Sequence, residues 1–480
     1  MLKLVWLLIV FVCSSRADFC PATAITSSNP TGNLPVGATN ITLIPKGTNC
    51  TITFQIPNNY VLLLKFSFDF QSENDTVRIV NNLNKVATIS HTPSTLYNAR
   101  LFIAPKSATV TIIGVSGKSR FMVNYNYQYL GTYTQTSYKT GEYFPLSKIQ
   151  NNSYVTITAS SNNEKVVLTP GVFISTADDE LKRFFVYDGD NINTANMIGT
   201  LSDMANAITV STGKSLSIVN FYEASSASYL LGNDASTVQG FSKYYVYMTT
   251  KRSKITGQVT DLSKGSAYTF ICTDCSTFYW TNINFANSFT NAAYVTFQGQ
   301  TPTHKMEKLI KYEPMTFTNN YLPQLIQSNI LTINVYLTQL HFNFNNIDDD
   351  TEWRKPYSGR KGYIFSPILW MPTDDNFNYE FRNDSQLYNF TVVMNKMAIP
   401  NGDVLNLSIG SGTGNPSVSN QFPRDKVSNG VVMSKGNYLQ LSLKSLGAAD
   451  VRLLFEMTAT STATAIGFFA SIILSLINIF

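Results

Sequence analysis

Residues 62–70 read Leu62-Leu63-Leu64-Lys65-Phe66-Ser67-Phe68-Asp69-Phe70, and this stretch decides the fold class. Every second residue from Leu62 to Phe70 is large and apolar, while Lys65, Ser67 and Asp69 lie between them. Successive side chains of a β-strand point to opposite faces, so the pattern predicts a strand with one buried and one polar face. A slip of one residue would turn the large apolar groups to water, so the register is well specified.

The same alternation recurs at residues 51–56, 109–112, 405–409 and 439–443. Short turn signals such as Asn401-Gly402-Asp403 separate these segments, and no apolar stripe of helical spacing exceeds two turns. Many short alternating strands between turns are typical of β-sandwiches and barrels. The sequence therefore predicts an all-β protein.

The length and composition fit several such domains. The 480 residues are too many for one sandwich, and ordinary domain sizes predict three or four. Aromatic residues make up 13% and charged residues 14%, a mixture that suits pleated, half-buried surfaces. The formal charge is +5, without a basic run longer than two residues, so no nucleic-acid partner is expected.

The N-terminus has the pattern of a secretory signal peptide. Lys3 precedes an apolar run of about nine residues, and Ser15 and Ala17 supply small residues before a cleavage site. A signal anchor is the alternative, but the run is too short to span a bilayer comfortably. We expect residues 1–17 to be removed and the mature chain to begin near Asp18, which lowers the charge from +5 to +3.

Removal of the signal also removes Cys13 and leaves four cysteines, Cys20, Cys50, Cys272 and Cys275. An even number in an oxidising compartment indicates two disulfides, and proximity in sequence favours Cys20–Cys50 and Cys272–Cys275. The first would stabilise its domain by roughly 3–4 kcal/mol. The Cys-Thr-Asp-Cys element also fits a redox pair or half a zinc site, but a structural disulfide is favoured because no second Cys-x-x-Cys exists.

Asn-x-Ser/Thr sequons agree with this compartment. We expect glycosylation at these positions: Asn40, Asn74, Asn151, Asn383, Asn389 and Asn406. Asn29 and Asn415 are excluded because proline follows them.

Residues 463–480 form an uncharged hydrophobic tail that runs to the last residue. A transmembrane helix needs about 20 apolar residues and usually a basic stop after them. This tail is shorter and lacks the stop, so it resembles a GPI-attachment signal more closely than a short membrane span. The expected location is the extracellular face of the plasma membrane, in a raft if GPI-anchored, or secreted.

Soft breaks in composition divide the chain between its two ends. Residues 131–141 and 251–264 are polar, and residues 345–361 carry the densest charge. The predicted units are sandwiches over 18–130, 131–250, 251–345 and 362–457, with a charged linker over 346–361.

Several segments resemble known domains. From Phe19-Cys20-Pro21 through Cys50-Thr51-Ile52 to 121–127, residues 18–130 resemble the CUB-like domain of a nematode family of secreted proteins. Phe185-Val186-Tyr187-Asp188-Gly189 is similar to a CUB strand and turn, and Gly362-Tyr363-Ile364-Phe365-Ser366-Pro367 to a CUB opening. The resemblance implies tandem CUB-like jelly-roll β-sandwiches.

Many CUB domains bind calcium, and Asp75 matches one of the acids that hold it. The turn at Asn81-Asn82 lacks a second Asp, and Lys182 stands where the second unit would carry an acid. Calcium needs six to eight oxygen ligands, usually with several carboxylates. We therefore expect no complete metal site and no cofactor, with Asp75 as a weak calcium candidate.

No motif for catalysis is present, so the protein is predicted not to be an enzyme. His91, His304 and His341 lie far apart in sequence, in turns or on a polar strand face. The carboxylates of Asp374-Asp375 would point to opposite faces of a strand, so they favour a solvated turn over an acid pair.

A binding module remains the leading class, because the end loops of sandwiches gather recognition residues. The resemblance implies an innate immune or defence role at an epithelium, with an extracellular protein or glycan as ligand. Two alternatives stay open: a structural glycoprotein coat without a defined ligand, and a calcium-dependent adhesion module. Residues 125–129 and 278–280, rich in aromatic rings, would either stack on sugars or alternate between core and rim.

The anchor generates the first testable prediction. Phosphatidylinositol-specific phospholipase C is expected to release the protein from cells that express it, because the tail would be exchanged for a lipid. Immunoblotting of medium and membranes measures the release. Retention on the membrane after treatment would replace the GPI anchor with a short membrane span.

Overall fold

The structure is a computed structural model, and it describes residues 20–90, 94–174, 177–251, 254–261, 263–286, 292–304, 306–346, 349–372, 376–422, 430–445 and 449–460. These residues form several mostly antiparallel sheets and three short helices, α1 (Leu201–Asn206), α2 (Ala235–Val238) and α3 (Thr351–Arg354). The all-β prediction is confirmed. The predicted signal peptide and tail lie outside the described residues.

The chain divides into two compact units that alternate along the sequence. Unit 1 comprises residues 1–168 and 178–232, and unit 2 comprises residues 169–177 and 233–480. The boundary falls inside β13 (Val166–Phe173) and β17 (Tyr229–Asp234), so both strands contribute to both units. The boundaries predicted between four sandwiches remain predictions.

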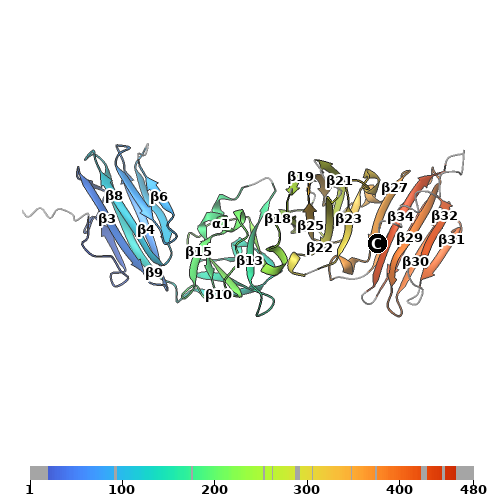
Figure 1. Ribbon diagram of the computed structural model, residues 1–480, viewed down its shortest axis with the longest axis horizontal. Coiled ribbons are helices and arrows are strands. Elements are labelled where there is room, and N and C mark those ends of the chain that lie inside the picture. The colour runs from blue at the N-terminus through green and yellow to red at the C-terminus, as the bar shows by residue number, and fades with distance from the viewer. Residues whose placement is uncertain are drawn as a thin grey trace, which may run out of the picture. The chain divides into compact units, whose positions relative to one another are not determined.

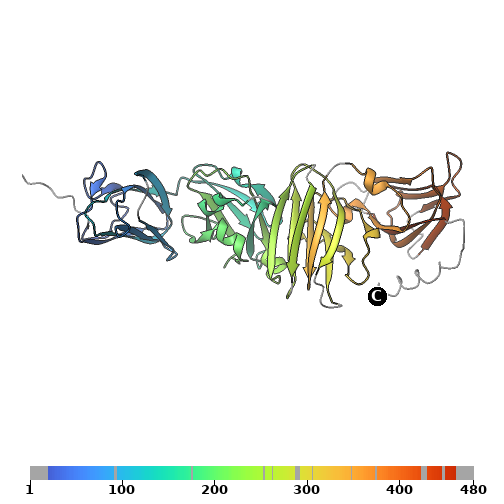
Figure 2. The same ribbon diagram turned by 90° about the horizontal axis from the view of Figure 1, so that it is seen from above.

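Unit 1 begins with a sandwich of two sheets, seen as the blue strands of Figures 1 and 2. One sheet has the order β1-β9-β4-β7, with β2 also paired to β9, and the other has the order β3-β8-β5-β6. The strands are β1 (Thr31–Leu34), β2 (Thr42–Leu43), β3 (Thr48–Ile56), β4 (Tyr60–Asp69), β5 (Thr76–Val80), β6 (Val86–Ile89), β7 (Leu96–Ile103), β8 (Lys106–Gly114) and β9 (Arg120–Tyr129).

Strand β4 carries the stretch that predicted the fold, and its alternating apolar residues lie in the core between these two sheets. Leu62, Leu64 and Phe66 are at most 2% exposed. The opposite face is not polar throughout, because Val61 and Leu63 are also buried, in a second cluster with residues from the next part of unit 1. Burial of both faces explains the continuous apolar run at the start of the strand.

The rest of unit 1 is built around the sheet β10-β12-β16-β14-β15. Its strands are β10 (Thr134–Lys139), β12 (Ser153–Thr158), β14 (Phe184–Asp188), β15 (Asn196–Thr200) and β16 (Ser215–Asn220), and β11 (Tyr143–Pro145) pairs with β17. β10 and β12 run parallel, whereas the other neighbours in this sheet are antiparallel. Tyr154, Phe185 and Phe221 cover Val61 and Leu63 of β4, so the two parts of unit 1 share a core.

Unit 2 contains two further sandwiches. In the first, strands in the order β18-β20-β25-β22-β23 face the sheet β19-β26-β21-β24, and Gly171–Phe173 of β13 pair with β18. The strands are β18 (Lys243–Thr249), β19 (Lys254–Asp261), β20 (Ser266–Cys272), β21 (Phe278–Ala286), β22 (Tyr294–Gly299), β23 (Lys308–Tyr312), β24 (Gln324–Ile326), β25 (Ile330–Tyr336) and β26 (Thr338–Asn345). Trp280 lies fully buried between the layers.

The last sandwich packs the sheet β27-β34-β29-β32 against β28-β33-β30-β31. The strands are β27 (Arg360–Phe365), β28 (Phe377–Arg382), β29 (Tyr388–Ala398), β30 (Val404–Gly410), β31 (Val418–Phe422), β32 (Gly430–Gly436), β33 (Tyr438–Lys444) and β34 (Asp450–Ala459). The alternation predicted at 405–409 and 439–443 is confirmed, because Leu405, Leu407 and Leu441 are fully buried.

The segment predicted as a charged linker packs into unit 2. Trp353 and Arg360 are 1% and 0% exposed. The Arg360 guanidinium donates hydrogen bonds to the carbonyl oxygens of Leu322 (3.1 Å), Pro323 (3.2 Å) and Trp353 (2.6 Å). The Arg360 cation thus satisfies buried backbone acceptors.

A second polar contact joins the same strands. The Gln324 side chain donates to the Tyr363 carbonyl and accepts from the Tyr363 N–H, both at 2.9 Å, so it copies the pairing of a strand neighbour. Nearby, a side chain at Gly299 would overlap the Trp370 carbonyl at 1.8 Å. The two sandwiches of unit 2 therefore approach backbone to backbone.

Both predicted disulfides are confirmed. Cys20 bonds to Cys50 at the start of the first sandwich, and Cys272 bonds to Cys275 at the end of β20. Cys50 and Cys272 are at most 1% exposed. The Cys-x-x-Cys element therefore forms a disulfide that begins at the last residue of a core strand.

Arg360 provides a test of this packing. Arg360→Met is expected to destabilise unit 2 by roughly 2–4 kcal/mol, because it removes the guanidinium donor from the Pro323 and Trp353 carbonyl groups, while the Leu322 carbonyl keeps the Tyr357 hydroxyl. The control is Lys361→Met, which removes only a half-exposed ion pair with Glu456 and is expected to cost less than about 1 kcal/mol. Thermal unfolding and hydrogen exchange of β27 measure the difference. Equal effects from the two variants would contradict a structural role for Arg360.

Candidate functional site

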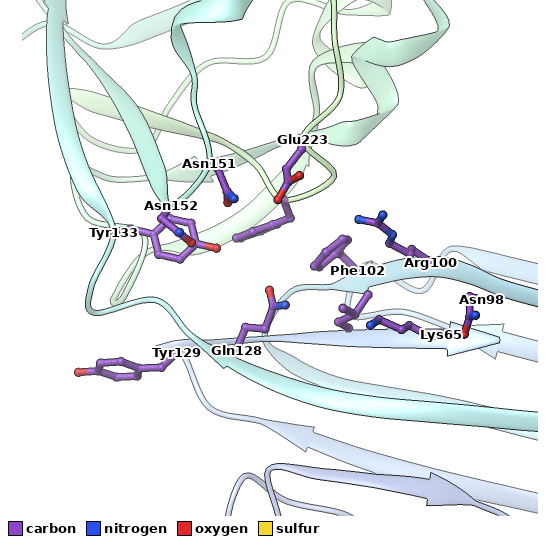
Figure 3. Close-up of a pocket in the computed structure, with 12 residues that line it drawn as sticks. Lys65, Asn98, Arg100, Phe102, Gln128, Tyr129, Tyr133, Asn151, Asn152 and Glu223 are labelled. Atoms are coloured by element: carbon purple, nitrogen blue, oxygen red, sulfur yellow. The ribbon is translucent and has the colours of Figure 1, made fainter. Parts of the chain in front are cut away.

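A pocket of about 660 Å³ lies within unit 1, where the first sandwich meets the sheet that follows it. Figure 3 shows side chains from the first sandwich on one wall and side chains from later loops on the other. One wall includes Lys65, Asn98, Arg100, Phe102 and Gln128, and the other includes Tyr133, Asn151, Asn152, Phe221 and Glu223.

A row of polar residues crosses the first wall. Lys65 of β4 lies directly opposite Arg100 of β7 and Asn124 of β9, and Asn124 in turn lies opposite Asn33 of β1. Residues opposite each other in antiparallel strands share a face, so the four side chains follow one line across the sheet. Two cations are neighbours in this line.

Asn98 reaches the pocket through an irregularity in β7. The β4–β7 register shifts between Phe66 and Phe68, and the Asn98 N–H donates to the Ser67 hydroxyl at 3.1 Å. Asn98 has a φ of 55°. Bulges of this kind redirect a side chain, and here the side chain is aimed at the pocket.

Two turns form the opposite wall, and both contain left-handed residues. Asn152 has a φ of 51° and Glu223 a φ of 54°. The Asn220 side chain holds the Glu223 turn by donating to the Ala224 carbonyl (2.9 Å) and accepting from the Ala224 N–H (3.0 Å). Left-handed conformations are uncommon for Glu, and such strain concentrates at functional sites.

Aromatic rings form the back of the pocket and fix its walls to each other. Phe102 stacks on Phe221 with ring centroids 5.7 Å apart and meets Tyr222 edge-on at 4.8 Å. The Phe102 N–H donates to the Tyr222 hydroxyl at 3.1 Å. An ion pair between Lys85 and Asp203, at 2.6 Å, adds a polar contact between the same two parts. The pocket therefore has preformed walls.

The electrostatics of the pocket are uneven. Within the described residues, neither Lys65 nor Arg100 has an ion-pair partner. Burial raises the pKa of the Tyr133 hydroxyl, and the nearby Glu223 carboxylate raises it further. Tyr129 lines the rim, but Figure 3 shows its ring pointing away from the other side chains.

Two other hollows lack this combination of charges. One is lined by residues of β28 and β33 and contains a single charged residue, Lys444. The other, at residues 21–37 and Tyr125, contains none. The unit 1 pocket is therefore the better candidate for recognition of a polar ligand.

Asp75, the weak calcium candidate, has a structural role. It is fully buried, and one oxygen accepts from the N–H groups of Val115 (2.6 Å) and Ser116 (2.9 Å). The other accepts from the hydroxyls of Ser116 and Ser119 (2.6 Å to Ser119). Burial alone would raise the pKa of Asp75, but these hydrogen bonds outweigh it and lower the pKa to about 2. Both oxygens are occupied by protein donors, which leaves little capacity for a cation.

The predicted glycosylation sites lie in different environments. Asn40, Asn74 and Asn151 are exposed, whereas Asn383, Asn389 and Asn406 are half-buried. The Asn383 amide donates to the Tyr388 hydroxyl at 3.2 Å and accepts from Ser385. Asn151 lines the unit 1 pocket, so a glycan there would stand at its mouth. Glycosylation at all six positions stays a prediction.

The other sequence candidates do not come together. The His304 ring forms a hydrogen bond with the Thr301 hydroxyl, and the His341 ring forms one with the Gln339 side chain. His91 and the Asp374-Asp375 pair lie outside the described residues. Among the described residues, no group of three or more His, Cys, Asp or Glu side chains is placed to hold a metal. In that same set, no helix is long and apolar enough to cross a bilayer.

The aromatic segments proposed for sugar stacking belong mainly to cores. Tyr125 and Tyr127 are buried in the first sandwich. Phe278 and Trp280 lie in one core of unit 2, and Tyr279 faces the other. Residues 125–129 therefore alternate between core and rim, whereas residues 278–280 are buried on both faces of their strand.

Comparison with known families identifies the first sandwich. Residues 13–131, which are 119 of the 480, match the family described as CUB-like domain. The resemblance seen in the sequence is confirmed to that extent. No curated protein sequence matches the chain.

Solved structures were also compared. The CUB1-EGF-CUB2 domains of rat MASP-1 are 11% identical over 67% of this chain and 99% of theirs, with a TM-score of 0.19. The CUB1-EGF-CUB2 domain of human MASP-1/3 is 11% identical over 66% of this chain and 99% of its own, with a TM-score of 0.19. The full extracellular region of zebrafish Gpr126/Adgrg6 is 12% identical over 69% of this chain and 53% of its own, with a TM-score of 0.19. Structural similarity at a TM-score of 0.19 supports no conclusion about the fold or function of this chain.

Asp75 gives a prediction about pH. Its pKa is lowered in the folded chain, so it contributes stability above the ordinary value of 3.8 that is lost as the pH falls toward about 2. Asp75→Asn should cost on the order of 2 kcal/mol at neutral pH and flatten the acid dependence of the first sandwich. Glu73→Gln, at an exposed carboxylate nearby, is the control and should change stability by less than about 0.5 kcal/mol.

Acid titration followed by circular dichroism and amide exchange of β5 and β8 measures both effects. Calcium added at neutral pH should not stabilise the wild-type chain through this residue. A calcium-dependent stabilisation that Asp75→Asn abolishes would contradict the structural role.

Proposed function

We propose that this chain is a non-catalytic recognition protein of the extracellular surface, and that the unit 1 pocket is its ligand site. The CUB-like domain and the two disulfides support an extracellular module. The predicted signal peptide, glycans and lipid anchor agree with this location.

The observation that carries the proposal is the pocket itself. Its walls are fixed by a shared aromatic core, yet polar and charged side chains line the interior. Ligand sites usually combine a preformed hollow with a few convergent polar groups. Three of the six non-glycine left-handed residues among the described ones, Asn98, Asn152 and Glu223, line this pocket, and strained backbone positions of this kind are found at functional sites.

The biological setting rests on the resemblance alone. Secreted nematode CUB-like proteins suggest a role in innate immunity or the defence response, exerted at an epithelium against pathogens. The ligand would then be a glycan or protein on a foreign surface.

Two alternatives make different predictions. A structural coat would need no ligand and would leave the pocket without function. A calcium-dependent adhesion module would need an acidic site, whereas Asp75 is already satisfied by four hydrogen bonds. Recognition through the pocket accounts for more of the structure.

A binding screen tests the proposal. The full-length protein, displayed on transfected cells, is incubated with arrayed glycans and with whole bacteria. We expect saturable binding that Gln128→Trp weakens by about tenfold, because the larger side chain fills the pocket. Gln55→Trp is the matched control, since Gln55 is exposed on the other sheet of the same sandwich and lies outside the pocket.

Saturable binding that is lost only in Gln128→Trp supports the pocket as the ligand site. The absence of saturable binding to glycans and to bacteria would sink the proposal in favour of the coat. Equal loss in the two Trp variants would place the ligand elsewhere.

A further inference from the structure

We propose that the unit 1 pocket takes an acidic carbohydrate, with Lys65 and Arg100 holding the acid group. This inference rests on the proposed function and specifies the chemical class of its ligand.

The Lys65–Arg100 pair is the first observation. Like charges directly opposite each other across antiparallel strands repel and destabilise the sheet. Neither cation is relieved by an acid within the described residues. An anion bound over the pair would remove the repulsion and form charge-assisted hydrogen bonds.

The second observation concerns the location of the pair. On the outer face of β4, Val61 and Leu63 are buried, and Lys65 is the next residue on that face. Lys65 is therefore a half-buried cation beside a hydrophobic junction, and Arg100 is an exposed cation next to it. Partial exclusion of water around Lys65 makes its attraction for an anion stronger than that of a fully exposed lysine.

The remaining side chains favour hydroxyl groups over further charge. Gln128, Asn98, Asn151 and Asn152 contribute amides, each of which both donates and accepts hydrogen bonds. Sugar hydroxyls have the same dual capacity. The half-buried ring of Tyr133, which also lines the pocket, offers an apolar surface for the C–H face of a sugar.

Glu223 limits how much negative charge the ligand can carry. Figure 3 shows it on the wall opposite Lys65 and Arg100. Its carboxylate accepts hydrogen bonds from hydroxyls but repels a second anionic group. A nucleic acid or a polyacidic peptide would bring several charges and meet this repulsion, whereas a sugar with one acid group would not.

The volume agrees with this assignment. About 660 Å³ falls within the range of small-molecule sites, so a short saccharide fits and a folded protein does not. Lys65 and Arg100 would fix the orientation of the acid group, and the amide side chains would form hydrogen bonds with the hydroxyls. A carboxylate and a sulfate share this chemistry, and the experiment separates them.

The test compares matched trisaccharide and disaccharide probes on the full-length protein. The probes are lactose, 3′-sialyllactose with one carboxylate and 3′-sulfolactose with one sulfate. Calorimetry should show at least one acidic probe binding about tenfold more tightly than lactose, with affinity that falls as salt is added. Whichever acidic probe binds identifies the acid group. Equal affinity for lactose and both acidic probes would overturn the inference.

Charge variants assign the effect to the pocket. The double variant Lys65→Gln/Arg100→Gln should lower affinity for the acidic probe to that for lactose. Lys46→Gln/Arg78→Gln is the matched control, because it removes two exposed cations of the same sandwich that do not line the pocket. Equal losses in the two double variants would show non-specific attraction and contradict the inference.

Thermal stability separates a ligand role from a structural one. Because the pair repels, Lys65→Gln/Arg100→Gln should leave the unfolding midpoint unchanged or raise it. A lowered midpoint together with retained acidic-sugar binding would contradict the assignment.

Failure of this inference remains distinct from failure of the proposed function. Binding to bacteria or to neutral glycans that Gln128→Trp abolishes, without preference for acidic probes, keeps recognition and removes the acidic class. Absence of binding to any glycan or bacterium removes both.

Discussion

Burial of both faces of a strand is the constraint on which the rest of each unit depends. In unit 1, β4 sends Leu62 into the first sandwich core and Leu63 into the junction with the next sheet. In unit 2, Ile364 and Phe365 of β27 lie in different cores. A strand that serves two cores cannot slip or detach without exposing apolar surface on both sides, so neighbouring sandwiches become one compact body.

The candidate site follows from where this double burial stops. The large apolar residues on the outer face of β4 end at Leu63, and the half-buried Lys65 follows them beside the junction. Hydrophobic contacts between the two parts of unit 1 thus hold the walls of the pocket in place. Its chemistry comes from turns whose conformations are held by side chains such as Asn220. The same packing that joins the two parts also supplies a preorganised place for a ligand.

Local patterns predicted much of this structure. Alternation located core strands such as β30 and β33, and an even number of cysteines gave both disulfides. The signal for the junction was also present, because Leu63 continues an apolar run where a polar residue would complete the alternation. The environment of Arg360 and the pocket could not be predicted, because most of their partners lie tens of residues or more away in sequence and only the fold brings them together.

The alternation of the two units along the chain has a consequence for synthesis. Residues 169–177 belong to unit 2, whose other residues begin at 233, while unit 1 is completed only by 178–232. A chain leaving the ribosome must therefore hold Gly171–Phe173 out of a finished sheet until Val246–Met248 of β18 arrive. During that interval a strand edge stays open to wrong partners. Until β18 is complete, cellular chaperones would therefore encounter the protein with one strand edge unpaired.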